Sequence, residues 1–486
     1  MYEYKKGKYE ATFESLYTHD YPEWFRDAKF GIWSHWGPQS VPMYGDWYAR
    51  KMYQEDDDSY RYHIRKYGHP SKFGYKDIVK LWKAENFDPD ELMSLYVKAG
   101  ARYFMGQAVH CDNFYNYASK VNRFNSVNMG PGKDISKMWQ DAAHKHNIPF
   151  GLSEHNGIAH YWFGSNKLAD TRGKYAGVPY DGNDPEYRDF YLDNYDVPKE
   201  AHYPQWYWPN AKFYKYWYES VKEMIDLYNP DLLYTDGGLP FAEYQAAATS
   251  DELYAAGLSA VAHLYNSSIE KHGYLRSVYL QKDRRPEIYK VGILDIEKSQ
   301  LPEMDDLPWH TDTCIGDWFY DVRRPYKSAK QIIEMLVDIV SKNGAMLLNI
   351  LQKPDGTIDE EARFLLEEVA DWFAACGEGI HGSRPWRTYR EGASEVLIDG
   401  FREETVEWTP SDFRFTKKGN VVYAYMLAVP ENRIAVIKSF TEKEIVKKVR
   451  LLGHGEVAFS QQFGAVSVRL PDNMPAKTAN CLAIEL

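Results

Sequence analysis

The sequence predicts a (β/α)8-like barrel of the TIM type, followed by a C-terminal antiparallel β-sandwich. Strand-like and helix-like stretches alternate through about 370 residues, which is typical of a parallel sheet covered by helices. At least six βα units can be distinguished, close to the eight of a closed barrel. After Pro385 the helical periodicity stops, and short alternating strands separated by turn signals take over.

The first predicted units lie in the N-terminal part of the chain. Lys29–His35 is a short, mostly apolar run that predicts the first strand. Asp88–Ala99 is amphipathic and is followed by Gly100, which favours a helix with a C-terminal glycine. The same reasoning predicts a strand at Arg102–Val109, a helix at Asp134–His146 and a strand at Pro149–Ser153.

The segment from Asn229 to Gly238 is the most informative part of the chain. A predicted helix, Phe213–Tyr228, ends before Pro230, and the next five residues predict a buried strand. Asp236 stands at the C-terminal end of this strand, followed by two conformationally permissive glycines. Carboxylates in this place carry the chemistry of barrel enzymes, although Asp-Gly-Gly is also an ordinary turn sequence.

The last barrel elements lie between residues 252 and 376. A predicted strand, Val291–Ile296, has Glu297 at its C-terminal end, so that this carboxylate would share a face with Asp236. The other elements predicted here are helices at Glu252–Lys271, Lys327–Ser341 and Asp359–Cys376, and a strand at Ala345–Ile350.

Short strands indicate the second domain. Lys418-Gly419-Asn420 is a hairpin signal between two of them. We therefore expect a barrel over residues 1–388 and a β-sandwich over residues 389–486. The clearest strands of the sandwich are Asp412–Phe415, Val421–Met426 and Ala465–Leu470.

Composition and charge restrict the class of function. The 486 residues include 44% hydrophobic side chains, enough for two domains with sizeable cores. A net charge of −12 argues against a nucleic-acid or anionic-membrane partner, because no basic stripe is present to neutralise phosphates. Aromatic residues make up 16%, with 40 Tyr and 15 Trp, which suits a protein that stacks rings against sugars.

The cysteines and apolar runs carry no further signal. Cys111, Cys314, Cys376 and Cys481 lie far apart and form no C-x-x-C pair, so we predict free thiols. No stretch reaches the roughly 20 apolar residues of a membrane span. Met1–Tyr9 lacks the apolar core of a signal peptide, and the sequence leaves the compartment open.

Polar residues stand at the predicted ends of several strands. In a barrel such residues converge on one face although they are scattered in sequence. Two carboxylates with several histidines fit glycoside cleavage: one carboxylate attacks or activates water, and the other protonates the leaving oxygen. The candidates are His35, His110, Asp112, Glu154, His155, Asp236, Asp295, Glu297 and Asp312.

A metal centre is the rival chemistry for the histidines. His35, His110 and His155 could be ligands, but the sequence has no H-x-H or H-E-x-x-H spacing. A hydrogen-bonded structural role is the other alternative for each of them. We expect no metal here.

Several separated motifs resemble one enzyme family. Trp24–Gly37 (W-F-R-D-A-K-F-G-I-W-S-H-W-G) and Tyr44–Tyr48 (Y-G-D-W-Y) are similar to the opening of family 29 glycoside hydrolases, the retaining exo-α-L-fucosidases. The resemblance spans residues 20 to 390, and its ordered set of motifs is highly specific. It continues through Phe87–Asp90, Asn125–Val127, Tyr175–Tyr187, Pro230–Gly238, Leu294–Glu297, Trp309–Trp318 and Asn343–Ile350.

The resemblance implies a barrel followed by a β-sandwich, double displacement with retention, and no metal or organic cofactor. Asp236 stands at the place of the family's nucleophile. Asp46 occupies a position where the family often has Glu. Trp318 resembles the family's aromatic residue that forms the pocket wall near the C5 substituent of the sugar. Positions that line the sugar pocket are matched by His35, His110, Trp47 and Tyr234, to which we add the strand-end residues Glu154 and His155.

The acid/base residue is harder to assign, because the family carries it on a variable stretch. Some branches have a Glu directly after the Trp that matches Trp309, but this chain has His310 there. The branch that the sequence most resembles carries a Glu in a D-x-E motif, seen here as Asp295-Ile296-Glu297. We predict that Glu297 is the acid/base, with Asp295, Glu303 and Asp312 as rivals.

One departure bears on the substrate. The family commonly has two adjacent histidines where this chain reads His110-Cys111. Cysteine is a much weaker hydrogen-bond partner than imidazole. Either a neighbouring side chain replaces the lost contact, or Cys111 belongs to a reshaped pocket that admits L-galactose, or its sulfated form if a basic group is near.

The sequence therefore predicts an exo-acting retaining glycosidase that removes terminal α-L-fucosyl or closely related residues. The alternatives are an exo-α-L-galactosidase on algal-type, possibly sulfated galactans, and an enzyme that cleaves both α-L-fucosides and β-galactosides. A different class, an inactive glycosidase scaffold that only binds sugar, is also open because of His310. An independent sugar-binding role for the C-terminal domain is weaker.

The expected partner is an oligosaccharide or glycan. Linkage and aglycone contacts would come from two long aromatic insertions, Tyr44–Lys83 and His155–Asn210, which the sequence does not resolve further. The resemblance implies an exported, periplasmic bacterial enzyme. The oligomeric state stays open.

Overall fold

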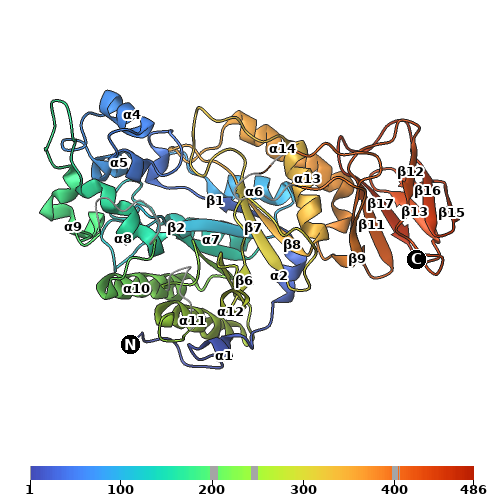
Figure 1. Cartoon of the computed structure of the whole chain (residues 1–486), viewed down its shortest axis with the longest axis horizontal. Coiled ribbons are helices and arrows are strands. Elements are labelled where there is room, and N and C mark those ends of the chain that lie inside the picture. Colours follow the sequence, from blue (N-terminus) through green and yellow to red (C-terminus); the bar gives the residue numbers. More distant parts are fainter. Residues whose placement is uncertain (1, 198–205, 242–249, 397–402, 404) are drawn as a thin grey trace.

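The computed structural model describes residues 2–197, 206–241, 250–396, 403 and 405–486. A barrel of strands and surrounding helices occupies most of the molecule, and antiparallel sheets form the C-terminal end (Figure 1). This arrangement confirms the predicted fold class. Among the described residues, no helix combines the length and apolar character needed to cross a bilayer.

Eight parallel strands form the barrel, in the order β6-β5-β4-β3-β2-β1-β8-β7. The two edges meet at a parallel bridge between Asp295 and His310, where the Ile296 N–H donates to the His310 carbonyl at 3.0 Å. Every residue of these strands is buried. The strands are β1 Phe30–Ser34, β2 Phe104–Val109, β3 Phe150–Glu154, β4 Leu232–Thr235, β5 Val278–Gln281, β6 Ile293–Leu294, β7 Trp309–Cys314 and β8 Gly344–Asn349.

Six of these strands were predicted, and β5 and β7 were missed. β5 is only four residues long and runs directly into the charged Lys282-Asp283-Arg284-Arg285, which hides its apolar run. β7 reads W-H-T-D-T-C, and its polar residues are buried among other polar groups. A very short strand, or one whose buried residues are polar, lacks the pattern of apolar residues by which strands are recognised in a sequence.

Helices cover the outside of the barrel and begin at ordinary N-caps. Asp88, Asp134, Asn210 and Asp359 each accept backbone N–H bonds at the start of the following helix. The long helices are α6 Pro89–Lys98, α7 Ile135–Lys145, α10 Ala211–Tyr228, α11 Ala255–His272, α13 Ala329–Ser341 and α14 Glu360–Cys376. The shorter ones are α1 Phe13–Leu16, α2 Glu23–Ala28, α3 Tyr48–Lys51, α4 Asp58–Lys66, α5 Tyr75–Leu81, α8 Ala159–Trp162, α9 Arg188–Tyr191 and α12 Pro286–Tyr289, with single 3₁₀ turns between several of them.

The two long insertions are joined through buried carboxylates. Asp170 accepts hydrogen bonds from the hydroxyls of Tyr60 at 2.7 Å and Tyr180 at 2.6 Å. Asp181 accepts one from Tyr53 at 2.7 Å and pairs with Lys76 at 3.2 Å. In Figure 1 helices α4 and α5 of the first insertion accordingly lie at the same end of the molecule as α8 and α9 of the second. The insertions therefore form one structure at the edge of the barrel mouth.

The C-terminal part contains two antiparallel sheets, of order β14-β13-β17-β11-β10-β9 and β12-β16-β15. An apolar core that includes Phe413, Phe415, Ile437 and Val468 fills the space between them. The strands are β9 Arg384–Glu391, β10 Phe413–Lys418, β11 Val421–Met426, β12 Ile434–Ile437, β13 Lys448–Leu451, β14 Gly455–Glu456, β15 Phe459–Gln462, β16 Ala465–Arg469 and β17 Asn480–Glu485. The domain boundary that we propose, between residues 388 and 389, falls within β9.

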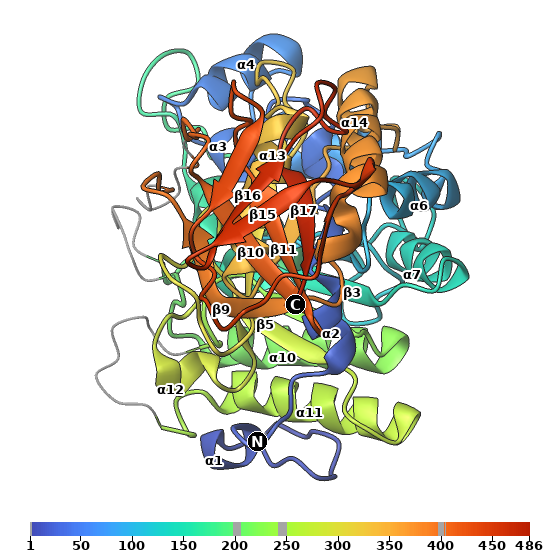
Figure 2. The same ribbon diagram turned by 90° about the vertical axis from the view of Figure 1, so that its right-hand side faces the viewer.

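The larger of these sheets packs against the barrel, as Figure 2 shows from the C-terminal end, where it lies over α13 and α14. Arg414 of β10 bonds Asp338 of α13, and Lys342 Nζ lies 2.9 Å from the other oxygen of that carboxylate. None of the three side chains is more than 4% exposed. Asp338 thus compensates two cations that are removed from water.

We expect the Asp338→Ala substitution to destabilise the protein strongly. It leaves two buried cations without a counter-ion, and breaking such a pair costs about 3 to 5 kcal/mol. The measurement is the thermal unfolding midpoint, followed by circular dichroism. Lys477→Ala is the control, because Lys477 joins the same two domains through an exposed ion pair with Glu368. It should leave the Tm unchanged. Equal shifts for both variants would contradict a dominant role for the buried pair.

Candidate active site

Five neighbouring strands each end immediately before a polar residue. In sheet order, β1, β2, β3, β4 and β5 are followed by His35, His110, His155, Asp236 and Lys282. Because the strands are parallel, these side chains meet at one end of the barrel, the C-terminal end. The sequence predicted four of them, and Lys282 was missed together with its strand.

Asp236 lies at the centre of this group. Its oxygens are 3.1 Å from Lys282 Nζ and 3.3 Å from both His155 Nδ1 and the Tyr234 hydroxyl. Burial alone would raise the pKa of Asp236, but Lys282 and His155 hold it well below its usual range. The following Gly237 has φ +87°, a conformation that glycine adopts without strain. Asp236 is therefore an ionised carboxylate, and 26% of its side chain remains exposed.

Glu297 faces Asp236 across the same lysine. Its Oε2 binds Lys282 Nζ, and its Oε1 accepts a hydrogen bond from Trp318 Nε1 at 3.1 Å. Two oxygens bound to one nitrogen can be separated by no more than two hydrogen-bond lengths, about 6 Å. Glu297 is 21% exposed, so both carboxylates border open space. The geometry unites the two acids that the sequence predicted as a catalytic pair.

Three histidines form a compact cluster beside Asp236. The ring centre of His35 is 5.0 Å from that of His110 and 4.9 Å from that of His155. Burial and mutual repulsion hold the pKa of His35 and of His110 well below the usual value, so both rings are neutral. Neutral imidazoles each offer one donor and one acceptor, which is what sugar hydroxyls require.

The tautomer of His110 follows from its neighbour Gln39. The Ala49 N–H donates to Gln39 Oε1 at 3.2 Å, which leaves the Gln39 Nε2 amide to donate to His110 Nδ1 at 2.8 Å. Nδ1 is therefore an acceptor, and Nε2 carries the proton. His35 Nδ1 and His155 Nε2 have no hydrogen-bond partner within the described part of the chain. They are buried polar atoms whose hydrogen-bonding capacity the described residues leave unused.

The spacing of the cluster also bears on the metal alternative. One nitrogen from each of His35, His110 and His155 lies within 4.8 Å of the others, close enough to hold a cation. His155, however, is directed through Nδ1 at the Asp236 carboxylate. The arrangement suits hydroxyl groups at least as well as a metal, and we keep the assignment to sugar binding.

Aromatic rings enclose the site. Trp33 stacks on His155 at 5.6 Å and lies 5.5 Å from Trp318, which also approaches His35. Phe319 contacts His35 at 4.7 Å, measured between ring centres. Trp47 lies farther along, against Trp162 and Trp206 in the insertions. Such walls suit the apolar faces of a sugar ring.

The other predicted binding residues occupy less open positions. Burial and the nearby Asp317 raise the pKa of Asp46 to about 8, and its Oδ1 has no partner among the residues described. Glu154 is fully buried, accepts the Asn156 N–H at 2.9 Å, and has its pKa raised to about 8 by burial. The Cys111 thiol donates to the His155 carbonyl at 3.1 Å.

Two further residues that the sequence analysis discussed, the strand-end candidate Asp112 and the family departure His310, face inward. Asp112 is buried and bonds the Tyr75 hydroxyl and the Phe114 N–H, which anchors the chain after β2. His310 is fully buried, and it contacts Asp295 through Nδ1 and the Tyr103 hydroxyl through Nε2. His310 therefore belongs to the wall of the barrel and does not border the open pocket.

Sequence reasoning missed three residues that shape the site: Lys282, Gln39 and Phe319. A signal for Lys282 existed, because Val278–Gln281 is a β-branched, aromatic and aliphatic run that ends at a charge. Gln39 and Phe319 lie on connections after strands, where position in the sequence says little about direction.

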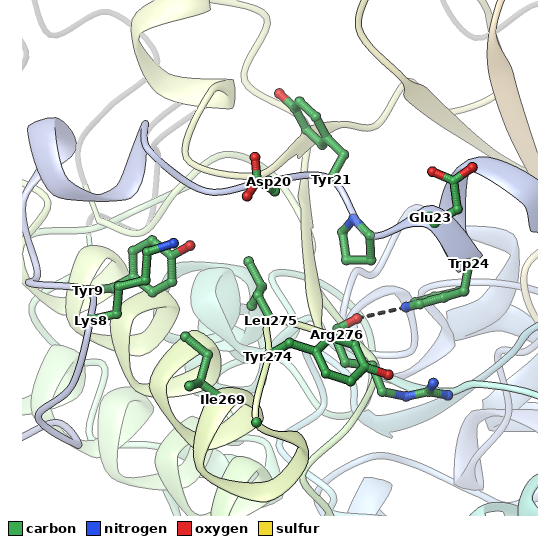
Figure 3. A pocket seen from close by; sticks show the side chains of 12 residues that line it. Lys8, Tyr9, Asp20, Tyr21, Glu23, Trp24, Ile269, Tyr274, Leu275 and Arg276 are labelled. Carbon is green, nitrogen blue, oxygen red and sulfur yellow. Dashed lines mark hydrogen bonds between the residues drawn. The ribbon is translucent and has the colours of Figure 1, made fainter.

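A separate cavity of about 600 Å³ lies at the opposite end of the barrel. Its walls include Tyr21, Trp24 and Arg276, which precede β1 and β5 (Figure 3). Trp24 donates a hydrogen bond to the Arg276 carbonyl at 2.8 Å, drawn as a dashed line in Figure 3. Residues before the strands are far from their C-terminal ends, so this cavity is not part of the site.

Comparisons with known proteins agree with this geometry. A family model described as alpha-L-fucosidase matches residues 2–378. The chain belongs to the α-L-fucosidase family. It is therefore a glycoside hydrolase. A second model of the family, for the α-L-fucosidase C-terminal domain, matches residues 404–485.

Relatives of this α-L-fucosidase family member extend over almost its whole length. Tissue alpha-L-fucosidase of Rattus norvegicus is 28% identical over 479 residues, which cover 96% of this chain and 89% of that protein. Plasma alpha-L-fucosidase of Homo sapiens is 26% identical, with coverage of 98% and 92%. The structure of Thermotoga maritima alpha-fucosidase in complex with fucose is similar with a TM-score of 0.73 and 25% identity, covering 98% and 100%.

Proposed function

We propose that this α-L-fucosidase family member is a retaining exo-glycosidase that removes terminal α-L-fucosyl residues from oligosaccharides. The observation that carries the proposal is the binding of Asp236 and Glu297 to one lysine. Retaining glycosidases hold their two carboxyl groups about 5 to 5.5 Å apart. The shared ammonium group limits the two oxygens that it binds to a separation of about 6 Å or less, which is compatible with that spacing.

In the proposed mechanism Asp236 is the nucleophile. Its carboxylate oxygen forms a bond to the anomeric carbon as the bond from that carbon to the aglycone oxygen breaks. Glu297 gives its proton to the departing oxygen. In the second step Glu297 takes a proton from water, the water oxygen attacks the anomeric carbon, and Asp236 departs as a carboxylate. Two inversions give net retention.

The burial of the rivals supports Glu297 as the acid/base. Asp295 and Asp312 are at most 1% exposed and bond to groups within the barrel wall. Glu303 is exposed on a loop near Tyr389 of the C-terminal sheet. Among these four, Glu297 alone is both partly exposed and bound to the lysine that Asp236 binds. The D-x-E motif is therefore our proposal for the acid/base position.

The position of His155 bears on the sugar. The resemblance led us to expect a second histidine next to His110, where this chain has Cys111. The ring of His155 lies 4.9 Å from that of His110, and its backbone carbonyl accepts the Cys111 thiol. We infer that His155, from the next strand, takes over the missing imidazole. This favours the fucose pocket over a reshaped one.

The test is the initial rate of hydrolysis of three aryl glycosides: α-L-fucoside, α-L-galactoside and β-D-galactoside. We expect the α-L-fucoside to be cleaved fastest, with weak α-L-galactosidase activity, because a methyl pocket rejects an added hydroxyl by only about 10- to 100-fold. A preference for the α-L-galactoside would instead support the galactan alternative. Binding of fucose without turnover would support an inactive sugar-binding protein.

A further inference from the structure

Lys282 is a single buried cation surrounded by acids. It is 12% exposed, binds Asp236 and Glu297, and lies 3.5 Å from Asp312 Oδ2. Asp295 also acts on it electrostatically. One positive charge cannot compensate four carboxylates when two of them, Asp295 and Asp312, are removed from water, so at least one of the four must hold a proton.

Asp295 and Asp312 are the two buried members of this group, at most 1% exposed, whereas Asp236 and Glu297 are partly exposed. Burial disfavours the charged form of a carboxyl group, so we place the proton on this pair. Asp295 Oδ1 contacts His310, and Asp312 Oδ2 contacts Tyr234 and Lys282. Asp295 Oδ2 and Asp312 Oδ1 have no hydrogen-bond partner among the described residues.

Burial and the negative charge of Asp295 raise the pKa of Asp312 well above its usual value, which agrees with a proton on Asp312. If Asp312 is neutral, the positive charge of Lys282 is compensated only by the two partly exposed carboxylates, Asp236 and Glu297. Asp236 and Glu297 then compete for one cation.

We propose that Lys282 is a positioning residue whose charge passes between Asp236 and Glu297 during the reaction, and that a permanently protonated Asp312 keeps it available to them. This inference rests on the proposed roles of the two carboxylates. In the first step Glu297 holds the proton, and Lys282 stabilises the Asp236 carboxylate. Once Asp236 has formed the neutral glycosyl ester and Glu297 has lost its proton, Lys282 pairs with Glu297. One ammonium group faces one carboxylate in each state.

The acid limb of the pH profile of kcat/KM tests this inference. Lys282 lowers the pKa of Asp236, so its removal raises that pKa, and Asp236 is protonated at a higher pH. Lys282→Met should therefore shift the acid limb upward by about one to three pH units and lower kcat/KM roughly 100-fold at the optimum. Lys282→Arg should restore the position of the limb, because guanidinium carries the same charge.

Other groups around Asp236 stay in place in these variants, so their effects are common to all of them. The titratable groups that face Asp236, besides Lys282, are His35, His110, Cys111, Glu154, His155, Tyr234, Asp295, Glu297 and Asp312.

Two variants distinguish an electrostatic role of Lys282 from a purely structural role. Asp312→Asn should leave the acid limb in place, because an amide is uncharged like a protonated carboxyl group and its oxygen can still accept from Tyr234 and Lys282. An upward or downward shift of a pH unit would show that Asp312 is charged. Lys342→Met is the matched control, since Lys342 is a buried lysine whose partner Asp338 retains Arg414. It should change neither the limb nor the rate.

A second readout does not depend on turnover. Carbodiimide activates protonated carboxyl groups, so coupling of a labelled amine to the Asp236 peptide, followed by mass spectrometry, reports its protonation across pH. Labelling of Asp236 in Lys282→Met should begin at a pH at least one unit higher than in the wild type. If the wild type cleaves no glycoside but the labelling shifts, the proposed function and the transfer of charge during a reaction fail, and only the pairing of Lys282 with an ionised Asp236 stands. An unchanged onset of labelling, with or without activity, would overturn the inference.

Discussion

Asp236→Gly is expected to lower kcat by roughly 10⁴-fold or more on every glycoside, equivalent to about 5 kcal/mol of lost transition-state stabilisation. The substitution removes the carboxylate that we propose as the nucleophile. The measurement is the release of nitrophenol from an α-L-fucoside, compared with Asp236→Asn.

The stereochemistry of rescue by azide distinguishes a lost nucleophile from a lost fold. In Asp236→Gly the vacated space admits azide, which attacks the anomeric carbon directly and inverts it once. We expect partial recovery of rate and a β-L-fucosyl azide as product, identified by NMR. The thermal unfolding midpoint should stay close to that of the wild type. A product of α configuration, or activity that survives in Asp236→Asn, would contradict the assignment.

Glu297→Ala is expected to affect substrates according to their leaving groups. A fucosyl oligosaccharide has a poor leaving group that needs a proton, so its hydrolysis should fall roughly 10³- to 10⁴-fold. A dinitrophenyl fucoside departs with little protonation, and its first step should be nearly unaffected. The measurement is kcat/KM on both substrates, since that constant reports the first step when the glycosyl enzyme forms irreversibly.

Azide again provides a contrast, because in Glu297→Ala it replaces water in the second step. The product should then be the α-L-fucosyl azide, formed with net retention. Glu303→Ala is the matched control, a carboxylate on the same loop that lies toward the C-terminal sheet. It should behave like the wild type on both substrates. An equal loss of activity on good and poor leaving groups in Glu297→Ala would assign that residue a different role.

The predicted elements agree with the structure where periodicity is strong. Helices α10, α13 and α14 lie within two residues of their predicted bounds at each end, because each has one apolar face and a capping residue. The strand before Asp236 was equally clear, since a proline and two glycines bound it. The C-terminal sheets were predicted as a class, but several of their strands were not, because short alternating segments at exposed edges resemble loops.

The residues of the candidate site were predicted where the strand before them was recognised in the sequence, and missed where it was not. Asp236, His35, His110 and His155 follow strands that are easy to recognise, and the barrel rule brings such ends together. Lys282 was missed because its strand, only four residues long, was not recognised. Whether Cys111 borders the pocket was equally open, and only the path of the neighbouring strand shows that its thiol is directed at the His155 backbone.

The sequence by itself determined the family, the fold class and the two carboxylates proposed for the chemistry, because these depend on local patterns and ordered motifs. The tertiary structure alone decided which charges share a partner. Lys282 and Asp236 are 46 residues apart in the chain yet follow adjacent strands, and Asp295 and His310 meet only where the barrel closes. Protonation depends on burial and on charges within a few ångströms, and those distances exist only in the folded chain.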